Sequence, residues 1–556
     1  MNHFLAVMTS PLEQWLRMSS AVPLMWMYFL LLITNTLVRD TKDTLLVISP
    51  AGVEAIPLLK SWVVIPASLI FFVIFYRLDK THTQRELLVL MMLFFNAFYI
   101  LFAIFLFPMM ASFTPTTLSA YLERTLPTNA QAIRLLLENW ILGLYYVVSE
   151  LWASAICSFM FWNVANNIMT VTEAKSTYPL IGASGNAGMI VAGTLLRIFA
   201  DRRDADVRAK AYLRIPAKGH GLKHYWSSST AQAEHRAWQG SLILISFIMF
   251  ISCGLIVLAY DAAFERKINA LARYSKYDDD LEEQIPSVIH DSHTGNVVKR
   301  RTNSGLKHVS SLIDSKKERK KGISVSEALL TLSRSRPLRA AALLVVSYGV
   351  SISLVEVSWK GQVKRSFPEP NDYSRFMGSF WTLTGMISML LMVLGRWVMQ
   401  KYGYGMAVMF TPTIMAISGT LFFSVTIFQD LFQQQDTISP WAAYFGGCAV
   451  LVAKAAKYSF FDATKEIIFI PLDDDSKNIG KAAIDVIAYR MSKSGGSIVL
   501  QIVIVLFGSL SGLGTIPIAM VFGLVVGAWI YGALTAKREM EKHGEEELGQ
   551  TTNHGI

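Results

Sequence analysis

The sequence predicts an all-α, polytopic membrane protein. Of its 556 residues, 53% are hydrophobic and only 17% are charged, which is far from the average of soluble domains. Apolar segments of about 20 residues, the length that crosses a bilayer as a helix, recur along the whole chain. The N-terminus lacks the basic start and small-residue cleavage site of a secretory signal, so we expect the first apolar segment to remain as a span in the lipid bilayer.

About twelve segments have the length and apolar character of spans. In chain order they cover residues 21–48, 57–76, 87–107, 137–166, 178–200, 239–262, 338–359, 374–399, 403–428, 439–470, 479–509 and 513–535. Basic residues follow the even-numbered spans in short loops, for example Arg77 after the second and Lys537 after the twelfth, which predicts that both termini are cytoplasmic. The loop 201–238 opposes this orientation, because it is rich in Lys and Arg yet is assigned to the other side.

A long polar segment, residues 263–337, divides the spans into six plus six. Its basic runs and low apolarity predict a cytoplasmic, partly disordered linker between an N-terminal half (1–262) and a C-terminal half (338–536), with a cytoplasmic tail at 537–556. This organisation is typical of the major facilitator superfamily, in which the substrate lies at the midplane between two halves that rock about it. The phosphate-binding motif G-x-x-x-x-G-K-[ST] is missing, so the sequence favours secondary transport over a pump driven by ATP hydrolysis.

Four charges directly follow the apolar run 21–38, with no Pro or Gly between the run and the charges to end the helix: Arg39, Asp40, Lys42 and Asp43. Each Lys, Arg or Asp placed in the middle of a membrane costs about 2.5–3.5 kcal/mol, so such charges must face one another or a polar cavity. Arg39 and Asp43 lie four residues apart on a helix and are expected to pair, which leaves Lys42 to meet an anion. The alternative is a helix that ends at Val38 and is followed by a solvated loop.

Two later spans carry an acidic residue within the membrane. In the fourth span, a carboxylate and a phenol share one helix face, at Glu150 and Tyr146. In the seventh span, Glu356 lies on one face with Ser353 and Lys360. Polar residues inside a membrane are candidates for function, although either glutamate can equally be a structural partner of a Lys or Arg on a neighbouring helix.

The tenth span predicts an anionic ligand. One narrow sector of this helix carries Lys454, Lys457, Phe461 and Lys465, flanked by Asp462 and Glu466. Three ammonium groups on one wall suit a polyanion such as a chain of phosphates, for which lysine is a recurrent partner. In the alternative interpretation, the outer two lysines extend toward the two membrane surfaces and leave one central cation.

Two glycine-rich segments have two interpretations each. Residues 182–188 open a span, where small residues more often allow close helix packing than cradle a phosphate. Residues 492–496 either break the eleventh helix and expose backbone groups or form a tightly packed bend. The three cysteines lie in apolar runs, so we expect no disulfide, no metal site and no cofactor.

Several sequence blocks carry a family resemblance. They are residues 39–45 (RDTKDTL), 54–57 (EAIP), 149–152 (SELW), 161–166 (FWNVAN), 355–360 (VEVSWK), 456–462 (AKYSFFD), 465–466 (KE), 470–473 (IPLD), 480–486 (GKAAIDV) and 492–496 (SKSGG). On these blocks the chain resembles the ATP/ADP translocase (nucleotide transporter) family of plastids and obligate intracellular bacteria. The resemblance implies a twelve-helix nucleotide carrier in a bacterial inner membrane. It also implies that Lys42, Glu150, Glu356 and Lys465 occupy positions where the family keeps charges needed for transport.

Met409 departs from the family pattern. The exchangers of that family have a lysine before Thr-Pro-Thr, where this chain has Met409, so selectivity for ATP and ADP over GTP, CTP and UTP is expected to be relaxed. The expected substrate-binding residues are Arg39, Lys42, Tyr146, Glu150, Glu356, Met409, Lys457, Phe461 and Lys465. The expected coupling or gating residues are Asp43, Glu150, Glu356 and Asp462.

The predicted activity is exchange of ATP for ADP, with no covalent change to either. Proton-coupled net import of several nucleotides is the alternative within the same class, with protons or phosphate as coupled ions. A membrane receptor or scaffold that does not transport is the alternative of another class. Much of the net charge of +10 lies in two polar segments, where basic residues set the orientation in the membrane, so no nucleic-acid partner is expected.

Overall fold

The computed structural model describes residues 11–127, 131–169, 171–212, 222–284, 332, 334–432, 435–469, 472, 484 and 488–553. Every regular element in these ranges is a helix. Ten helical segments among them are long and apolar enough to cross a membrane. The prediction of an all-α polytopic membrane protein is therefore confirmed.

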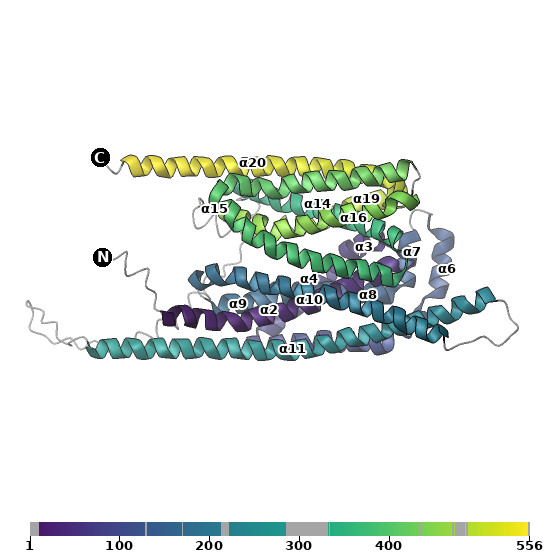
Figure 1. Cartoon of the computed structure of the whole chain (residues 1–556), viewed down its shortest axis with the longest axis horizontal. Coiled ribbons are helices and arrows are strands. Elements are labelled where there is room, and N and C mark those ends of the chain that lie inside the picture. The colour runs from purple at the N-terminus through teal and green to yellow at the C-terminus, as the bar shows by residue number, and fades with distance from the viewer. Residues whose placement is uncertain are drawn as a thin grey trace, which may run out of the picture.

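The N-terminal part of the chain forms a bundle of long helices (Figure 1). Its elements are α2 (Pro11–Ile48), α3 (Ala55–Leu58), η1 (Leu59–Val64), α4 (Ile65–Asp79), α5 (Gln84–Leu101), η2 (Phe102–Leu106), η3 (Met110–Phe113), α6 (Thr116–Thr125), α7 (Gln131–Glu138), α8 (Trp140–Trp152), η5 (Ala153–Met160), α9 (Phe161–Ile168), α10 (Val171–Tyr212) and α11 (Leu222–Gln284). Helix α2 is unbroken from Pro11 to Ile48, so the four charges after Val38 lie within the helix and not in a loop.

The C-terminal part forms a second group of helices, drawn green to yellow in Figure 1. Its elements are α14 (Arg336–Ser366), α15 (Pro370–Leu431), α16 (Gln435–Ala456), η6 (Lys457–Phe461), α17 (Asp462–Ile467), α19 (Tyr489–Phe507), η8 (Gly512–Gly514) and α20 (Thr515–Asn553). Helix α15 covers the predicted eighth and ninth spans and bends at Gly403, whose φ of 76° is favourable only for glycine. The predicted tenth span is helical in α16, η6 and α17, with η6 a π-helical segment.

The predicted linker and its neighbours are partly helical. Helix α11 continues to Gln284, so the first part of the predicted linker is helical, and the boundary at residue 263 stays a prediction. Residues 285–331 lie outside the described residues. The loop predicted at 201–238 is also helical at both ends, because α10 extends to Tyr212 and α11 begins at Leu222.

Glycines bring α10 against its neighbours at backbone distance. A Cβ on Gly188 would lie 2.5 Å from the carbonyl oxygen of Phe29 on α2. On the other side of α10, a Cβ on Gly193 would lie 2.5 Å from the carbonyl oxygen of Gly378 on α15. The packing interpretation of the segment 182–188 is therefore confirmed.

The second glycine segment also serves packing. Helix α19 continues through residues 492–496 without a break. A Cβ on Gly496 would lie 2.5 Å from the Cβ of Ser353 on α14, so this glycine allows two helices to approach closely. The interpretation of this segment as a helix break is therefore wrong.

Polar contacts join the two groups of helices where α10 ends and α15 begins. Arg375 on α15 contacts Asp201 at 2.9 Å and Asp204 at 2.5 Å, both on α10. The buried Arg203 donates to the side-chain oxygen of Asn371 at 2.7 Å. At the same end of the bundle, Gln501 on α19 donates to the backbone oxygen of Pro57 at 3.0 Å. These contacts close the bundle at one end.

We predict that Gly193→Ala destabilises the protein whereas Gly254→Ala does not. Alanine favours a helix over glycine by up to about 1 kcal/mol, and at Gly254 the new methyl group meets nothing within 4 Å. At Gly193 the same methyl group meets backbone of α15, and overpacking of this kind costs about 1–3 kcal/mol. Thermal unfolding in detergent measures both variants, and equal melting temperatures would contradict the close α10–α15 contact.

Candidate functional site

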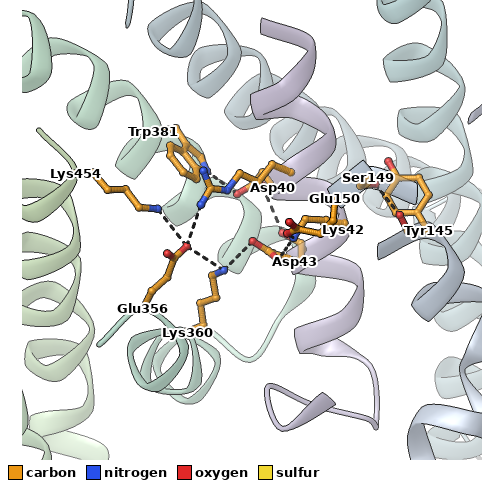
Figure 2. A network of polar contacts seen from close by, with 12 residues as sticks. Asp40, Lys42, Asp43, Tyr145, Ser149, Glu150, Glu356, Lys360, Trp381 and Lys454 are labelled. Atoms are coloured by element: carbon orange, nitrogen blue, oxygen red, sulfur yellow. Dashed lines mark hydrogen bonds and ion pairs between the residues drawn. The ribbon is translucent and has the colours of Figure 1, made fainter. Parts of the chain in front are cut away.

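A network of buried ion pairs lies between the two groups of helices (Figure 2). Its first centre is Asp43, a buried carboxylate on α2. One oxygen of Asp43 accepts from the Lys42 ammonium at 2.7 Å, and the other accepts from the Lys360 ammonium of α14, also at 2.7 Å. Both lysine side chains are only 3% exposed, so these charges are stable in the membrane because they are paired.

The second centre is Glu356 on α14, whose Oε1 is shared by three cations. Lys454 of α16 lies 3.1 Å from this oxygen, Lys360 lies 3.3 Å from it, and Arg39 of α2 lies 3.4 Å from it. Lys360 therefore connects the two centres, since it contacts both Asp43 and Glu356. Figure 2 shows this chain of contacts running from α16 through α14 to α2.

Helix α8 contributes a third carboxylate and an aromatic ring. Glu150 lies 3.0 Å from the Lys42 ammonium, which sits 3.8 Å from the centre of the Tyr146 ring. The next residue back, Ser149, accepts a hydrogen bond from Tyr99 of α5 at 3.3 Å and so helps to fix α8. The prediction that Glu150 and Tyr146 face the bundle interior together is confirmed.

The indole of Trp381 on α15 forms one side of the network. Its ring centre lies 4.7 Å from the Lys454 ammonium and 5.1 Å from the Arg39 guanidinium. Its Nε1–H donates to the Asp40 carboxylate at 3.1 Å. The network therefore combines side chains of α2, α8, α14, α15 and α16.

Some side chains of the network are partly accessible. The side chains of Arg39 and Glu150 are 35% and 23% exposed, and that of Glu356 is 12% exposed. Ammonium and guanidinium groups held within about 3 Å of carboxylates bind phosphate oxygens in the same geometry. The arrangement therefore suits an anion whose oxygens replace the carboxylates.

Other predicted site residues lie outside this network. Lys457 pairs with Asp462 at 2.8 Å, and Lys465 lies 3.3 Å from Glu466. Phe461 is buried and stacks on Tyr348 with ring centres 5.0 Å apart, and its expected contact with the substrate stays a prediction.

Met409, on α15, packs against the hydrophobic core. Its partly buried side chain therefore serves helix packing. The expectation that Met409 relaxes the selectivity among nucleotides stays a prediction.

Two pairing expectations are wrong. Arg39 binds Glu356 of a distant helix, although helical spacing suggested Asp43. Lys42 was expected to remain less neutralised, yet it contacts two carboxylates, Asp43 and Glu150. The alternative interpretation, in which Lys454 extends toward the membrane surface, does not hold, since Lys454 is buried against Glu356.

The expected substrate-binding and coupling residues leave out four residues of the network: Asp40, Lys360, Trp381 and Lys454. Three of them are charges within apolar segments, which is the signal that could have selected them. Trp381 carries no such signal, because an aromatic residue in a span is ordinary, and its role depends on the cations that the fold brings to its ring.

In sequence, the chain is similar to known ATP/ADP transporters. The family model described as TLC ATP/ADP transporter matches residues 7–540. ADP,ATP carrier protein 1 of Chlamydia trachomatis serovar D is 31% identical over 523 residues, which are 93% of this chain and 88% of the relative. The plastidic ATP/ADP-transporter of Solanum tuberosum is 33% identical over 532 residues, 95% of this chain and 74% of the relative. Among solved structures, an inward-facing bacterial homologue of the iron transporter ferroportin aligns with a TM-score of 0.49 and 14% identity, covering 96% of this chain and 99% of that one.

We predict a large energetic coupling between Asp43 and Lys360. Removing one partner of a buried pair leaves an uncompensated charge and costs about 3–5 kcal/mol, so Asp43→Ala and Lys360→Ala should each destabilise strongly and the double variant by less than their sum. The matched control is the exposed pair Arg85–Asp261, 2.7 Å apart, whose coupling should be much smaller. Double-mutant cycles on the free energy of unfolding measure both, and equal couplings would contradict the buried network.

Proposed function

Because the chain belongs to the TLC ATP/ADP transporter family, we propose that it is a membrane carrier that exchanges ATP for ADP by alternating access. The relatives named above are called ADP,ATP carriers or ATP/ADP transporters. The observation that carries the proposal is the sharing of the Glu356 carboxylate by three cations from three helices, Arg39, Lys360 and Lys454.

The nucleotide would bind through its phosphates in place of the carboxylates. Glu356 presents one oxygen to two lysines and an arginine, which is the donor set that a terminal phosphate attracts. Lys42 lies beside Glu150 in the same way. Each contact is stronger here than in water because the surroundings are largely dry, so several cations together can compensate a di- or triphosphate.

Exchange follows from where the ion pairs lie. Arg39–Glu356 and Lys360–Asp43 each join a helix of the proposed N-terminal half (1–262) to a helix of the proposed C-terminal half (338–536). An empty carrier is held in one conformation by these pairs. A bound nucleotide takes over the cations, releases the carboxylates and lets the halves move. The contacts of Arg375 with Asp201 and Asp204 would then break when the end of the bundle that they close opens.

The proposal also includes the orientation of the carrier in the membrane, its range of nucleotides and its mode of transport. Both termini are placed in the cytoplasm, with the carrier in a bacterial inner membrane. GTP, CTP and UTP are further candidate substrates beside ATP and ADP, and proton-coupled net import is the competing mode. Exchange needs a nucleotide on both sides, whereas net import does not, so the two modes differ in one measurable requirement.

We predict that purified protein in liposomes takes up labelled ATP when the liposomes contain ADP and far less when they are empty. Lys454→Ala and Lys42→Ala should reduce uptake at least tenfold, about 1.4 kcal/mol, because each removes a phosphate contact. The control is Lys537→Ala, an exposed lysine that faces Glu541 at 3.8 Å on α20 and should leave uptake unchanged.

Three results would contradict parts of this proposal. Equal uptake into loaded and empty liposomes would replace exchange by net import. Normal uptake by both network variants would exclude the network as the binding site. Absence of uptake by the native protein under a range of gradients would contradict nucleotide transport itself.

A further inference from the structure

Trp381 holds two cations together at the centre of the network. Its side chain is buried, and the Arg39 guanidinium and the Lys454 ammonium lie over the same indole, 5.1 and 4.7 Å from the ring centre. Both cations contact the same oxygen of Glu356, at 3.4 and 3.1 Å. Two like charges repel each other, and they do so more strongly away from water. The negative face of the indole offsets part of that repulsion.

Asp40 fixes the orientation of that indole. Its carboxylate is 1% exposed, and its Oδ1 accepts the Trp381 Nε1–H at 3.1 Å. Its other oxygen accepts from the hydroxyl of Thr44, one helical turn along α2, at 3.4 Å. An indole has a single polar group, so one hydrogen bond to a fixed acceptor sets the direction of the whole ring.

Asp40 differs from the other carboxylates of the network. Asp43, Glu150 and Glu356 each contact a lysine at 3.3 Å or less. In the part of the chain that the structure describes, no Lys or Arg nitrogen lies within ion-pair distance of Asp40. Its strongest contact is the neutral N–H of Trp381, so its place in the network depends on that bond and not on a salt bridge.

We propose that Asp40 is a positioning residue for nucleotide binding: its hydrogen bond holds the Trp381 indole as the surface that keeps Arg39 and Lys454 together for the phosphates. The inference rests on the proposed function and adds to it a residue that makes no direct contact with the ligand. The bond joins α2 to α15, so the positioning also depends on both proposed halves being docked as they are here.

The test measures the Kd for labelled ATP and the KM and maximal rate of exchange for five variants. Asp40→Ala removes the acceptor, and Trp381→Phe keeps an aromatic ring but removes the donor. Each should raise the Kd and the KM roughly tenfold, with a smaller change in maximal rate, because the ring that faces the two cations is no longer held in its orientation. The double variant should be no weaker than either single one, since both remove the same bond. Asp40→Asn keeps an acceptor oxygen and should stay within about twofold of the native Kd.

Trp359→Phe is the matched control. This buried indole also donates one hydrogen bond, to the backbone oxygen of Ala443 at 2.8 Å, and it packs on Phe380 with ring centres 4.6 Å apart. The variant should lower the melting temperature without changing the Kd for ATP. The comparison of Trp381→Phe with Trp359→Phe decides the matter even where Asp40→Ala fails to fold.

Three outcomes would overturn the inference while the proposed function stands. They are additive losses in the double variant, an Asp40→Asn variant as weak as Asp40→Ala, and equal effects of Trp381→Phe and Trp359→Phe on the Kd. A native protein that neither binds nor exchanges ATP would overturn the proposed function, and this inference with it.

Discussion

The Glu356 carboxylate, shared by three cations inside the membrane, is the interaction on which the rest of the structure depends. An isolated charge is expensive in this environment, so Arg39, Lys360 and Lys454 are tolerable only because Glu356 and its neighbour Asp43 neutralise them. The same requirement determines which helices must meet. Helices α2, α14 and α16 each contribute a charge to one point, and any arrangement that separated them would leave a charge unpaired in an apolar surrounding.

Two kinds of contact hold the helices together: ion pairs and close backbone packing at glycines. Charges join the helices at the centre of the bundle, where under the proposed function the charges of a ligand replace the carboxylates. Glycines join α10 to α2 and to α15, where Gly188 and Gly193 allow backbone contact and nothing needs to be exchanged. A carrier needs both kinds of contact. In the proposed cycle the contact of Gly188 with α2 lies within one half and stays formed, whereas the ion pairs and the contact of Gly193 with α15 join the two halves and must be able to change.

The sequence was sufficient to predict the helices and several of the faces that their residues share, but not which residues of different helices contact one another. Hydrophobic length predicted the ten spans found among the described residues, which do not include the predicted tenth and eleventh, and helical periodicity correctly put Glu150 and Tyr146 on one interior face. Periodicity describes a single helix, so it could not show that Arg39 would meet Glu356, a contact across 317 residues. In the tenth span, the lysines do not share one face as α-helical spacing suggested, and the reason is local. The π-helical η6 has a different number of residues per turn, so Lys454 and the residues after Lys457 do not keep the angular relation of an α-helix. The positions of Phe461 and Met409 depend on neighbouring helices, which no local pattern specifies.

The central claim is that the Glu356 carboxylate occupies the place of a nucleotide phosphate. The most direct measurement is the affinity for ATP of the variant Glu356→Gln, by calorimetric titration of monodisperse protein. If the carboxylate competes with phosphate, its removal leaves three cations without their partner and should tighten binding several-fold, up to roughly tenfold or 1.4 kcal/mol. Exchange should slow at the same time, because nothing replaces the nucleotide when it leaves. Weaker or unchanged binding of ATP by a folded Glu356→Gln protein would contradict the account.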